Sequence, residues 1–381
     1  MIQEIACSTM EEPLKGISRE IPAERAPAGP PIKPGTFAHT SPYGGCWLQH
    51  FYSRYCEDLY GGKVVRETDF LEKLLTTREL PEMMIMGNFI VDRFCILSIC
   101  RELGINAVHS EDGFFPHYET MHADPIGFCW ESSLTRMLYR GCTERQRSAA
   151  RAARQRWLTY RDEELPACVS PPYIFWPLQL LADRVNRWDL NVSEWNPLLR
   201  HFRQCTPEEI QLVIKEHPRG RPQDTRGLEE TAASLPNTVI VPTDTDVRSL
   251  VARSSAVAGA NSTVLYEARL MFHKPTYVYA RGWFTNHYDL FFPMARSFEA
   301  RTLNFIQYVE DNRRMRCGWL DDYTDWFLSQ LLARQIGRDL AEHDGDAFCA
   351  AVRRLSFQSY QKYGEEIFQA PPTDRRPHQR P

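Results

Sequence analysis

The stretch "LVIKEHPRGR", residues 212–221, ends a short apolar run in cations and an imidazole. The apolar residues predict a buried strand, and Pro218 fixes the direction of the chain after it. Lys215, His217 and Arg219 then lie where an open parallel sheet binds its ligands, beyond the carboxyl end of a strand. Because histidine titrates near neutrality, His217 is suited to donate to a phosphate or to protonate a leaving group. A solvated basic loop would also account for these residues.

A second stretch, "AVAGANSTVLYEA" at residues 256–268, predicts a strand that is followed directly by a helix. Asn261, Ser262 and Thr263 come at the helix start, where hydroxyls cap the helix and its free N–H groups suit a phosphate. The small residues before them let a ligand approach closely. Glu267 lies one turn into the helix, on the side of Thr263, and is suited to hold ribose hydroxyls. A plain N-cap would explain Ser262 without any ligand.

Two adjacent carboxylates, Glu111 and Asp112, end another predicted strand in "VHSEDGFFPHYETMHADP", residues 108–125. A carboxylate in a cleft acts as a general acid or base when its surroundings raise its pKa. A turn with solvated acids is the alternative interpretation. Asp124, further along, is expected to make a turn before Pro125.

A fourth polar group follows the strand predicted in "YIFWPLQLLADRVNRWD", residues 173–189. Gln179 ends this strand, and Asp183 follows four residues later. We expect Asp183 to face the same cleft from the second half of the chain. It would alternatively begin or cap the next helix.

Strand and helix signals alternate on both sides of a Pro-marked break, "LPACVSPP", at residues 165–172. The expected strands are 82–87, 105–113, 173–179, 210–218, 237–243, 256–261 and 275–280. The expected helices are 88–104, 143–161, 193–205, 246–255, 262–272 and a helical region from 293 to about 363. This alternation predicts two doubly wound α/β domains of Rossmann type with C-terminal helices.

The predicted domains divide the chain into four parts. They are a Pro-rich flexible segment (1–40), a Rossmann-like acceptor-side domain (41–168), a Rossmann-like nucleotide-sugar domain (169–292), and C-terminal helices with a disordered tail (293–381).

The composition is that of an ordinary globular protein of 381 residues, long enough for two domains. A net charge of −4 gives no indication of nucleic-acid binding. No stretch reaches the roughly 18 apolar residues of a membrane span, and the first residues predict no secretion signal. The 11 cysteines form no CxxC pair, which favours reduced thiols in the cytoplasm.

The E-D-G, H-P and S-T stretches, in this order, resemble motifs of bacterial GT-B sialyltransferases and of the related capsule polysaccharide synthesis family. That family includes bacterial Kdo transferases. "PLQLLAD" resembles its Pro-x-Gln strand end with a following acidic position. "EDGFFPHYETMHADPIGFCWESSL" resembles its E-x-G-aromatic-x-P stretch, which runs on to an Asp-Pro-x-Gly turn and a Ser-Ser-Leu. The resemblance covers about residues 80–290 and implies a GT-B-like fold with a CMP-activated acidic sugar as donor.

The resemblance also implies roles for the residues above. The CMP-binding group would be Lys215, His217, Pro218, Arg219, Asn261, Ser262, Thr263 and Glu267. His217 would bind the phosphate or help it leave. Gln179 and His117 would contact the substrate.

For catalysis, the resemblance makes Glu111, beside Asp112, the acid or base at the acceptor hydroxyl. Asp183 matches the acidic position that is proposed to attack the anomeric carbon in retaining Kdo transferases. Two successive displacements then preserve the configuration.

No cofactor and no metal are expected, because cations and helix N–H groups are able to neutralise a leaving phosphate. "TDTD" at 243–246 has the letters of a metal-binding DxD motif, but we interpret it as a strand-end loop and the N-cap of the next helix. The expected partners are a nucleotide-sugar donor and a glycan or glycolipid acceptor.

An arginine-rich helix, "TERQRSAARAARQRWLTYR" at 143–161, is suited to rest on anionic lipid. A solvated helix face is the alternative. The expected location is the cytoplasm, where this helix would allow association with the inner face of the cytoplasmic membrane.

Three functions are consistent with these residues. The first is a retaining CMP-Kdo transferase that builds a capsule, O-antigen or related glycan. The second is an inverting CMP-sialic acid transferase with Glu111 or Asp112 as base, in which Asp183 is dispensable. The third is a catalytically silent GT-B scaffold in polysaccharide export.

Overall fold

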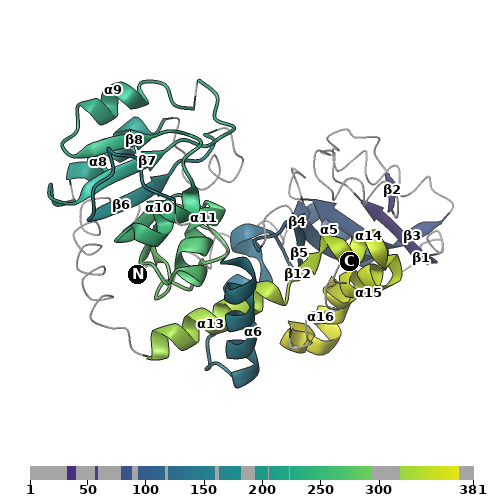
Figure 1. The fold of residues 1–381 in the computed structure, drawn as a ribbon. Helices are drawn as coiled ribbons and strands as arrows, with labels where there is room; N and C mark the ends of the chain where they lie inside the picture. Colours follow the sequence, from purple (N-terminus) through teal and green to yellow (C-terminus); the bar gives the residue numbers. More distant parts are fainter. Residues whose placement is uncertain are drawn as a thin grey trace, which may run out of the picture.

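The computed structural model describes ten stretches of the chain, and all structural statements below concern these. They are residues 32–39, 56–58, 79–87, 93–115, 119–158, 163–181, 194–204, 206–222, 224–293 and 318–368. Figure 1 shows two lobes, each built on one sheet, with α6 and α13 beside one another between them.

The first sheet has the strand order β12-β5-β4-β3-β1-β2. Its strands are β1 (Ile32–His39), β2 (Cys56–Asp58), β3 (Leu80–Gly87), β4 (Asn106–Asp112), β5 (Thr120–Asp124) and β12 (Gln335–Gly337). The pairs from β2 to β4 are parallel, whereas β5 runs antiparallel to β4 and to β12. The sheet is therefore parallel through most of its width and antiparallel at one edge.

Two predictions about this sheet are wrong. The segment 1–40 is not flexible throughout, because β1 pairs with both β2 and β3. The region after 293 is not purely helical, because β12 returns from the C-terminal part of the chain and pairs with β5. The predicted C-terminal tail beyond residue 368 lies outside the described residues.

The second sheet is parallel throughout, in the order β11-β10-β9-β6-β7-β8. Its strands are β6 (Tyr173–Pro177), β7 (Gln211–Lys215), β8 (Thr238–Val241), β9 (Ala256–Gly259), β10 (Thr276–Val278) and β11 (Phe292–Pro293). Counted from the first strand of this part of the chain, the order is 3-2-1-4-5-6 read from one edge, which is the order of a Rossmann fold. The predicted doubly wound domain is confirmed.

Alternate side chains of β6 explain why helices cover both faces of this sheet. Ile174 and Trp176 pack with α8 (Asn196–Gln204) and α9 (Leu228–Ala233). Tyr173 and Phe175 point the other way, into the core that includes residues of α10 (Val247–Arg253) and α11 (Thr263–Tyr266). A strand buried on both faces must be apolar along its whole length, as this one is.

The first sheet is also covered on both faces. Met84 and Met86 pack with α5 (Arg93–Glu102), while Met83 and Ile85 face the large core that includes α13 (Gly318–Leu332). The helix α5 is followed by Gly104 at φ +72°, the left-handed conformation that glycine adopts without strain.

Helix α6 (Glu144–Trp157) begins at a capping box, in which Thr143 and Gln146 bond each other's backbone N–H groups. Its buried Ala150 and Ala153 belong to the same core as α13. After β12 the chain continues in α14 (Arg338–His343), α15 (Gly345–Arg354) and α16 (Phe357–Tyr363). Among the helices of the described stretches, none has the length and hydropathy required to cross a membrane.

Candidate functional site

The strand order of the second sheet reverses between β6 and β9, and the helices that follow these two strands lie on opposite faces. Such a switch point is where open α/β sheets bind ligands. Gln179, just beyond β6, joins the two strand ends because its Oε1 accepts a hydrogen bond from Asn261 N at 3.0 Å. The predicted Gln179 and Asn261 therefore lie together at the switch point.

The H-P loop follows β7, which is the neighbour of β6. His217 Nδ1 accepts a hydrogen bond from Arg219 N at 3.0 Å. In the neutral imidazole the proton must then lie on Nε2, which makes Nε2 a donor. Gly220 N donates to His217 O at 2.7 Å, and a Cβ on Gly220 would lie 2.9 Å from that oxygen. The loop is a tight turn that sets the tautomer of His217.

Lys215 has a different environment from the one expected of a phosphate ligand. It is buried, and its Nζ donates to Thr243 O at 2.6 Å. Burial lowers the pKa of its amine, and the nearby Asp244 and Asp246 oppose this shift. The ammonium thus ties the end of β7 to the loop after β8.

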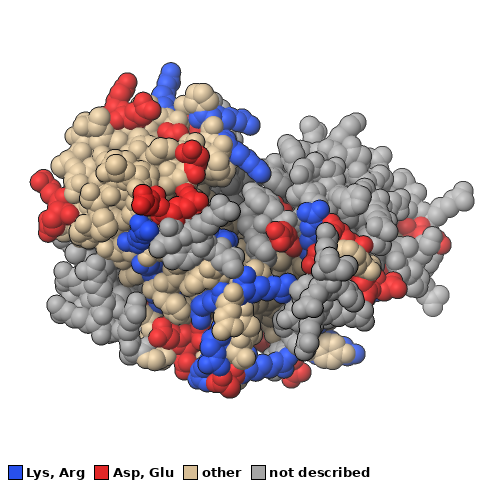
Figure 2. All heavy atoms as spheres, in the orientation of Figure 1, with Lys and Arg blue, Asp and Glu red and all other residues tan. Residues whose placement is uncertain are grey.

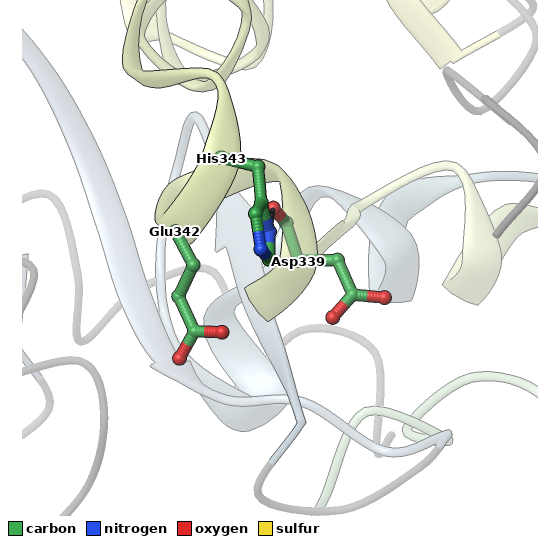
Figure 3. Close-up of side chains that lie close together, drawn as sticks. All are labelled: Asp339, Glu342 and His343. Carbon is green, nitrogen blue, oxygen red and sulfur yellow. Dashed lines mark hydrogen bonds between the residues drawn. The ribbon is translucent and has the colours of Figure 1, made fainter. Parts of the chain in front are cut away.

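The "TDTD" loop ends in a helix cap, as predicted. Asp246 Oδ2 accepts a hydrogen bond from Ser249 N at 2.6 Å at the start of α10. Within the described ranges, the residues with the spacing of metal ligands are not in this loop but on α14: Asp339, Glu342 and His343 (Figure 3). These side chains are exposed, and Glu342 accepts from Arg338 Nε at 2.6 Å. A solvated helix face explains the group.

The start of α11 is a standard N-cap, in which Ser262 Oγ accepts from Val264 N at 3.3 Å. Thr263 is the first residue of this helix. Gly259 is small for a packing reason, since a Cβ there would lie 3.2 Å from Leu265 Cδ2. The carboxylate of Glu267 lies 3.3 Å from Arg248 Nη2 of α10, so these two side chains form an ion pair.

The predicted acids, Glu111 and Asp112, are the last two residues of β4. Gly113 follows them because a Cβ there would lie 2.0 Å from Thr120 Oγ1 of the paired strand. Glu111 is opposite the buried His122 across the β4–β5 pair. Burial lowers the pKa of His122 well below its usual value, and the charge of Arg334 adds to the shift.

The acidic strand end meets the second sheet's lobe through aromatic contacts. The Phe114 ring centroid lies 4.9 Å from that of Tyr266 on α11 and 5.7 Å from that of Trp283. Burial raises the pKa of Tyr266 well above its usual value, and the charge of Glu111 contributes to this. The E-D-G end of β4 and the helix that follows the S-T stretch are therefore neighbours.

The Asp-Pro-x-Gly and Ser-Ser-Leu parts of the sequence pattern form one structural unit. Asp124 Oδ1 accepts from Ile126 N at 2.9 Å, which confirms the predicted turn. Asp124 Oδ2 accepts from Ser133 Oγ at 2.7 Å and pairs with the buried Arg334 at 3.4 Å. This stretch holds the chain together, and the arginine that completes it comes from the far end of the sequence.

Three positioning residues were missed by the sequence analysis. Gln335 Oε1 accepts from Phe114 N at 2.7 Å and from Phe115 N at 2.8 Å, so β12 fixes the loop after the acids. Asp224 joins two strand-end loops, and Arg334 completes the Asp124 unit. Arg334 and Gln335 lie within a region predicted as helical, and Asp224 lies six residues beyond a predicted strand, so none of the three stands directly at a predicted strand end.

Two arginines of the arginine-rich helix α6 form ion pairs with α13. Arg147 Nε and Nη2 donate to the Asp322 carboxylate at 2.7 and 3.0 Å, and Arg154 Nη1 donates to Asp325 at 2.6 Å. Figure 2 shows basic and acidic atoms intermixed over α6 at the lower middle of the view. The arginines that remain exposed on this helix are Arg145, Arg151 and Arg156.

Two of the predicted site residues, Asp183 and His117, lie outside the described residues, as does Arg161 of the arginine-rich segment. Pro218 and Arg219 are exposed in the H-P turn. The structure thus brings Gln179, Asn261 and the H-P loop together at the carboxyl-terminal ends of the adjacent strands β6, β9 and β7.

Two Rossmann-type sheets joined by crossing helices define a GT-B-like α/β fold, as the sequence predicted. Residues 136–287 match the model of the family described as capsule polysaccharide biosynthesis protein. This range contains β6 to β10, with the H-P and S-T strand ends. The predicted resemblance to this family is confirmed over that part of the chain.

Solved structures with a similar arrangement share little sequence with this chain. The β-Kdo 2,7-transferase KpsC of Thermosulfurimonas dismutans is 16% identical, covering 71% of this chain and 88% of its own, with a TM-score of 0.46. The β-Kdo 2,4-transferase of the same KpsC is 15% identical over 64% and 79%, with a TM-score of 0.43. S. aureus MnaA with UDP is 12% identical over 89% and 98%, with a TM-score of 0.39. No curated protein matches the sequence.

Proposed function

We propose that this protein is a glycosyltransferase that transfers an acidic sugar, Kdo, from CMP-Kdo to a growing bacterial surface glycan. The observation that carries the proposal is the pairing of Gln179 with Asn261 at the switch point of a Rossmann sheet, with the H-P loop after the neighbouring strand β7. The family match over the same strands supports a role in capsule synthesis.

The CMP phosphate would bind between the H-P turn and the start of α11. His217 Nε2–H is the donor for this phosphate, because Nδ1 is occupied by Arg219 N. The exposed Arg219 adds charge from the same turn, and Thr263 supplies a hydroxyl at the helix start. This arrangement needs neither a metal nor a cofactor to neutralise the leaving group.

The reaction would proceed in two displacements. The Asp183 carboxylate attacks the anomeric carbon, the bond from that carbon to the phosphate oxygen breaks, and CMP leaves with the bonding electrons. The acceptor hydroxyl then attacks the same carbon while Glu111 takes its proton, and the bond to Asp183 breaks. Two inversions give net retention.

CMP release in the presence of CMP-Kdo or CMP-sialic acid tests the function directly. The wild-type chain should release CMP from CMP-Kdo, and His217→Ala should lose about 100-fold or more in kcat/KM. His343→Ala, a histidine on the exposed face of α14, is the matched control and should keep the wild-type rate. Absence of turnover with both donors would refute the transferase proposal and favour a silent scaffold.

The mechanism has its own test. Intact-mass analysis of Glu111→Gln should find a Kdo adduct on the protein, and peptide mapping should place it on Asp183. Asp183→Asn should abolish transfer. Full activity of Asp183→Asn together with an inverted product would favour the second candidate, an inverting CMP-sialic acid transferase.

Association with a membrane surface is part of the proposal, because a lipid-linked acceptor would be presented there. It depends on Arg145, Arg151 and Arg156, whose side chains are exposed on α6, although Arg151 also pairs with Glu144 of the same helix. Arg147 and Arg154 are paired with α13 instead. Cosedimentation with vesicles containing phosphatidylglycerol should fall when Arg145, Arg151 and Arg156 are changed to glutamine. Equal binding to neutral vesicles would exclude this surface.

A further inference from the structure

Asp224 is a buried carboxylate, 4% exposed, at the end of the loop that begins with the H-P dipeptide. Its Oδ1 accepts a hydrogen bond from Leu181 N at 3.0 Å, and its Oδ2 accepts one from Arg221 N at 2.9 Å. Its own N–H donates to Arg221 O at 2.8 Å. One side chain therefore joins two loops that are 43 residues apart in the sequence.

These two loops are the ones that carry the proposed chemistry. Leu181 follows β6 and lies two residues before Asp183. Arg221 follows β7 and ends the turn that begins at His217. The last backbone hydrogen bond between the two strand ends runs from Leu178 N to Lys215 O at 2.8 Å, and both loops extend beyond it.

The H-P loop is internally ordered without Asp224. Gly220 N donates to the carbonyl oxygen of His217, and Arg219 N donates to its Nδ1. These bonds fix the shape of the turn but not its position relative to the β6 loop. The two carboxylate bonds of Asp224 supply that position, and a buried carboxylate with N–H donors makes strong hydrogen bonds.

We propose that Asp224 is a positioning residue that holds the β6 loop, from Gln179 to Leu181, at a set separation from the loop of His217. It touches neither the donor nor the acceptor, and it acts through the Leu181 and Arg221 amides. This inference rests on the proposed function. The predicted substrate contact Gln179 and the group that binds the leaving phosphate are then held in a fixed relation to one another.

The test uses Asp224→Asn in the full chain. The amide keeps the volume and one acceptor oxygen, but its NH2 group cannot accept from the second N–H. Asp246→Asn is the matched control, since Asp246 also accepts a backbone N–H in the same sheet's loops, at the start of α10.

Hydrogen exchange is measured on peptides that cover 178–181 and 217–222, together with CMP affinity and kcat. In Asp224→Asn, exchange should rise in both peptides, and kcat should fall about 10- to 100-fold. The Kd for CMP should stay within about threefold, because the bonds inside the H-P turn remain. Asp246→Asn should change neither peptide, although its Tm should fall.

Unchanged exchange at 178–181 in Asp224→Asn would overturn the inference. A fall in kcat no larger than that of Asp246→Asn would overturn it as well. If the wild-type chain turns over no CMP-linked donor, the proposed function fails, and the exchange measurement alone then decides whether Asp224 joins the loops. The two failures are therefore distinguishable.

Discussion

Removal of the Asp124 carboxylate should destabilise the first lobe more than any surface change. Both Asp124 and Arg334 have side chains that are 0% exposed, with Arg334 Nε 3.4 Å from Asp124 Oδ2. Burial lowers the pKa of Arg334 to about 10, and Asp124 opposes this shift. The guanidinium is still charged at neutral pH, so Asp124→Ala leaves a buried cation without its carboxylate.

The magnitude follows from what the carboxylate holds. Breaking a buried ion pair by removing one partner costs about 3–5 kcal/mol. Asp124→Ala also removes the acceptor for the N–H groups of Ile126, Gly127 and Ser133. Each buried N–H without an acceptor costs about 1–3 kcal/mol, and relaxation of the turn will recover part of it. We expect a loss of at least about 4 kcal/mol.

Urea unfolding followed by circular dichroism measures this loss. Glu342→Ala is the matched control, because Arg338 and Glu342 form an ion pair with side chains 45% and 37% exposed. That exposed pair should be worth less than about 1 kcal/mol. Asp124→Ala combined with Arg334→Met should be less destabilised than the sum of the two single changes, because the double variant contains no buried cation.

A loss in Asp124→Ala as small as that in Glu342→Ala would refute this reasoning. If the loss of unfolding free energy in the double variant equals the sum of the two single losses, the two side chains do not stabilise each other through their charges.

Three further predictions concern the same regions. First, burial lowers the pKa values of His122 and His287, so the unfolded chain takes up protons below about pH 6.5 that the native chain does not, and stability falls as pH falls. Urea unfolding at pH 7.5 and 5.5 should differ by about 1.4 kcal/mol for His122 and by less for His287, whose pKa the Leu134 hydrogen bond and the Asp289 charge hold up, and His122→Gln should remove its share. Second, Gly113→Ala should lower the Tm sharply, because its Cβ would lie 2.0 Å from Thr120 Oγ1, whereas Gly337→Ala, with nothing within 4 Å, should not. Third, Arg154→Met should destabilise the contact between α6 and α13 more than Arg151→Met does, since Arg154 is largely buried with Asp325 and Arg151 is exposed; thermal unfolding compares them.

The second sheet was predictable because its central strands, β6, β7, β9 and β10, are buried along their whole length. Such strands appear as continuous apolar runs, and each is followed by a polar or small residue where the strand ends. The strand ends after β6, β7 and β9 were therefore placed from the sequence alone, together with the caps at Asp246 and Ser262.

The first sheet was less predictable for two physical reasons. β1 contains Lys33, Pro34 and Gly35, and its register shifts between Lys33 and Phe37, so it has no regular strand pattern. β12 is three residues long and is stabilised by pairing with β5, more than 200 residues earlier. Pairing between distant segments leaves no local periodicity to detect.

The roles of individual side chains were harder to predict than their positions. Lys215 and Glu267 were placed correctly at a strand end and in the first turns of a helix. Their charged groups nevertheless contact Thr243 and Arg248. The spacing of residues along a strand or helix gives the end or face on which they lie, but the direction of a long side chain depends on partners from other elements.

The acidic strand end depends on the C-terminal part of the chain. Glu111 lies at the end of β4, but the loop that follows it is held by Gln335, and the turn beyond β5 is held by Arg334. These two residues are adjacent, at the point where α13 leads into β12. The returning segment thus closes the first sheet and fixes the surroundings of the proposed acid at the same time.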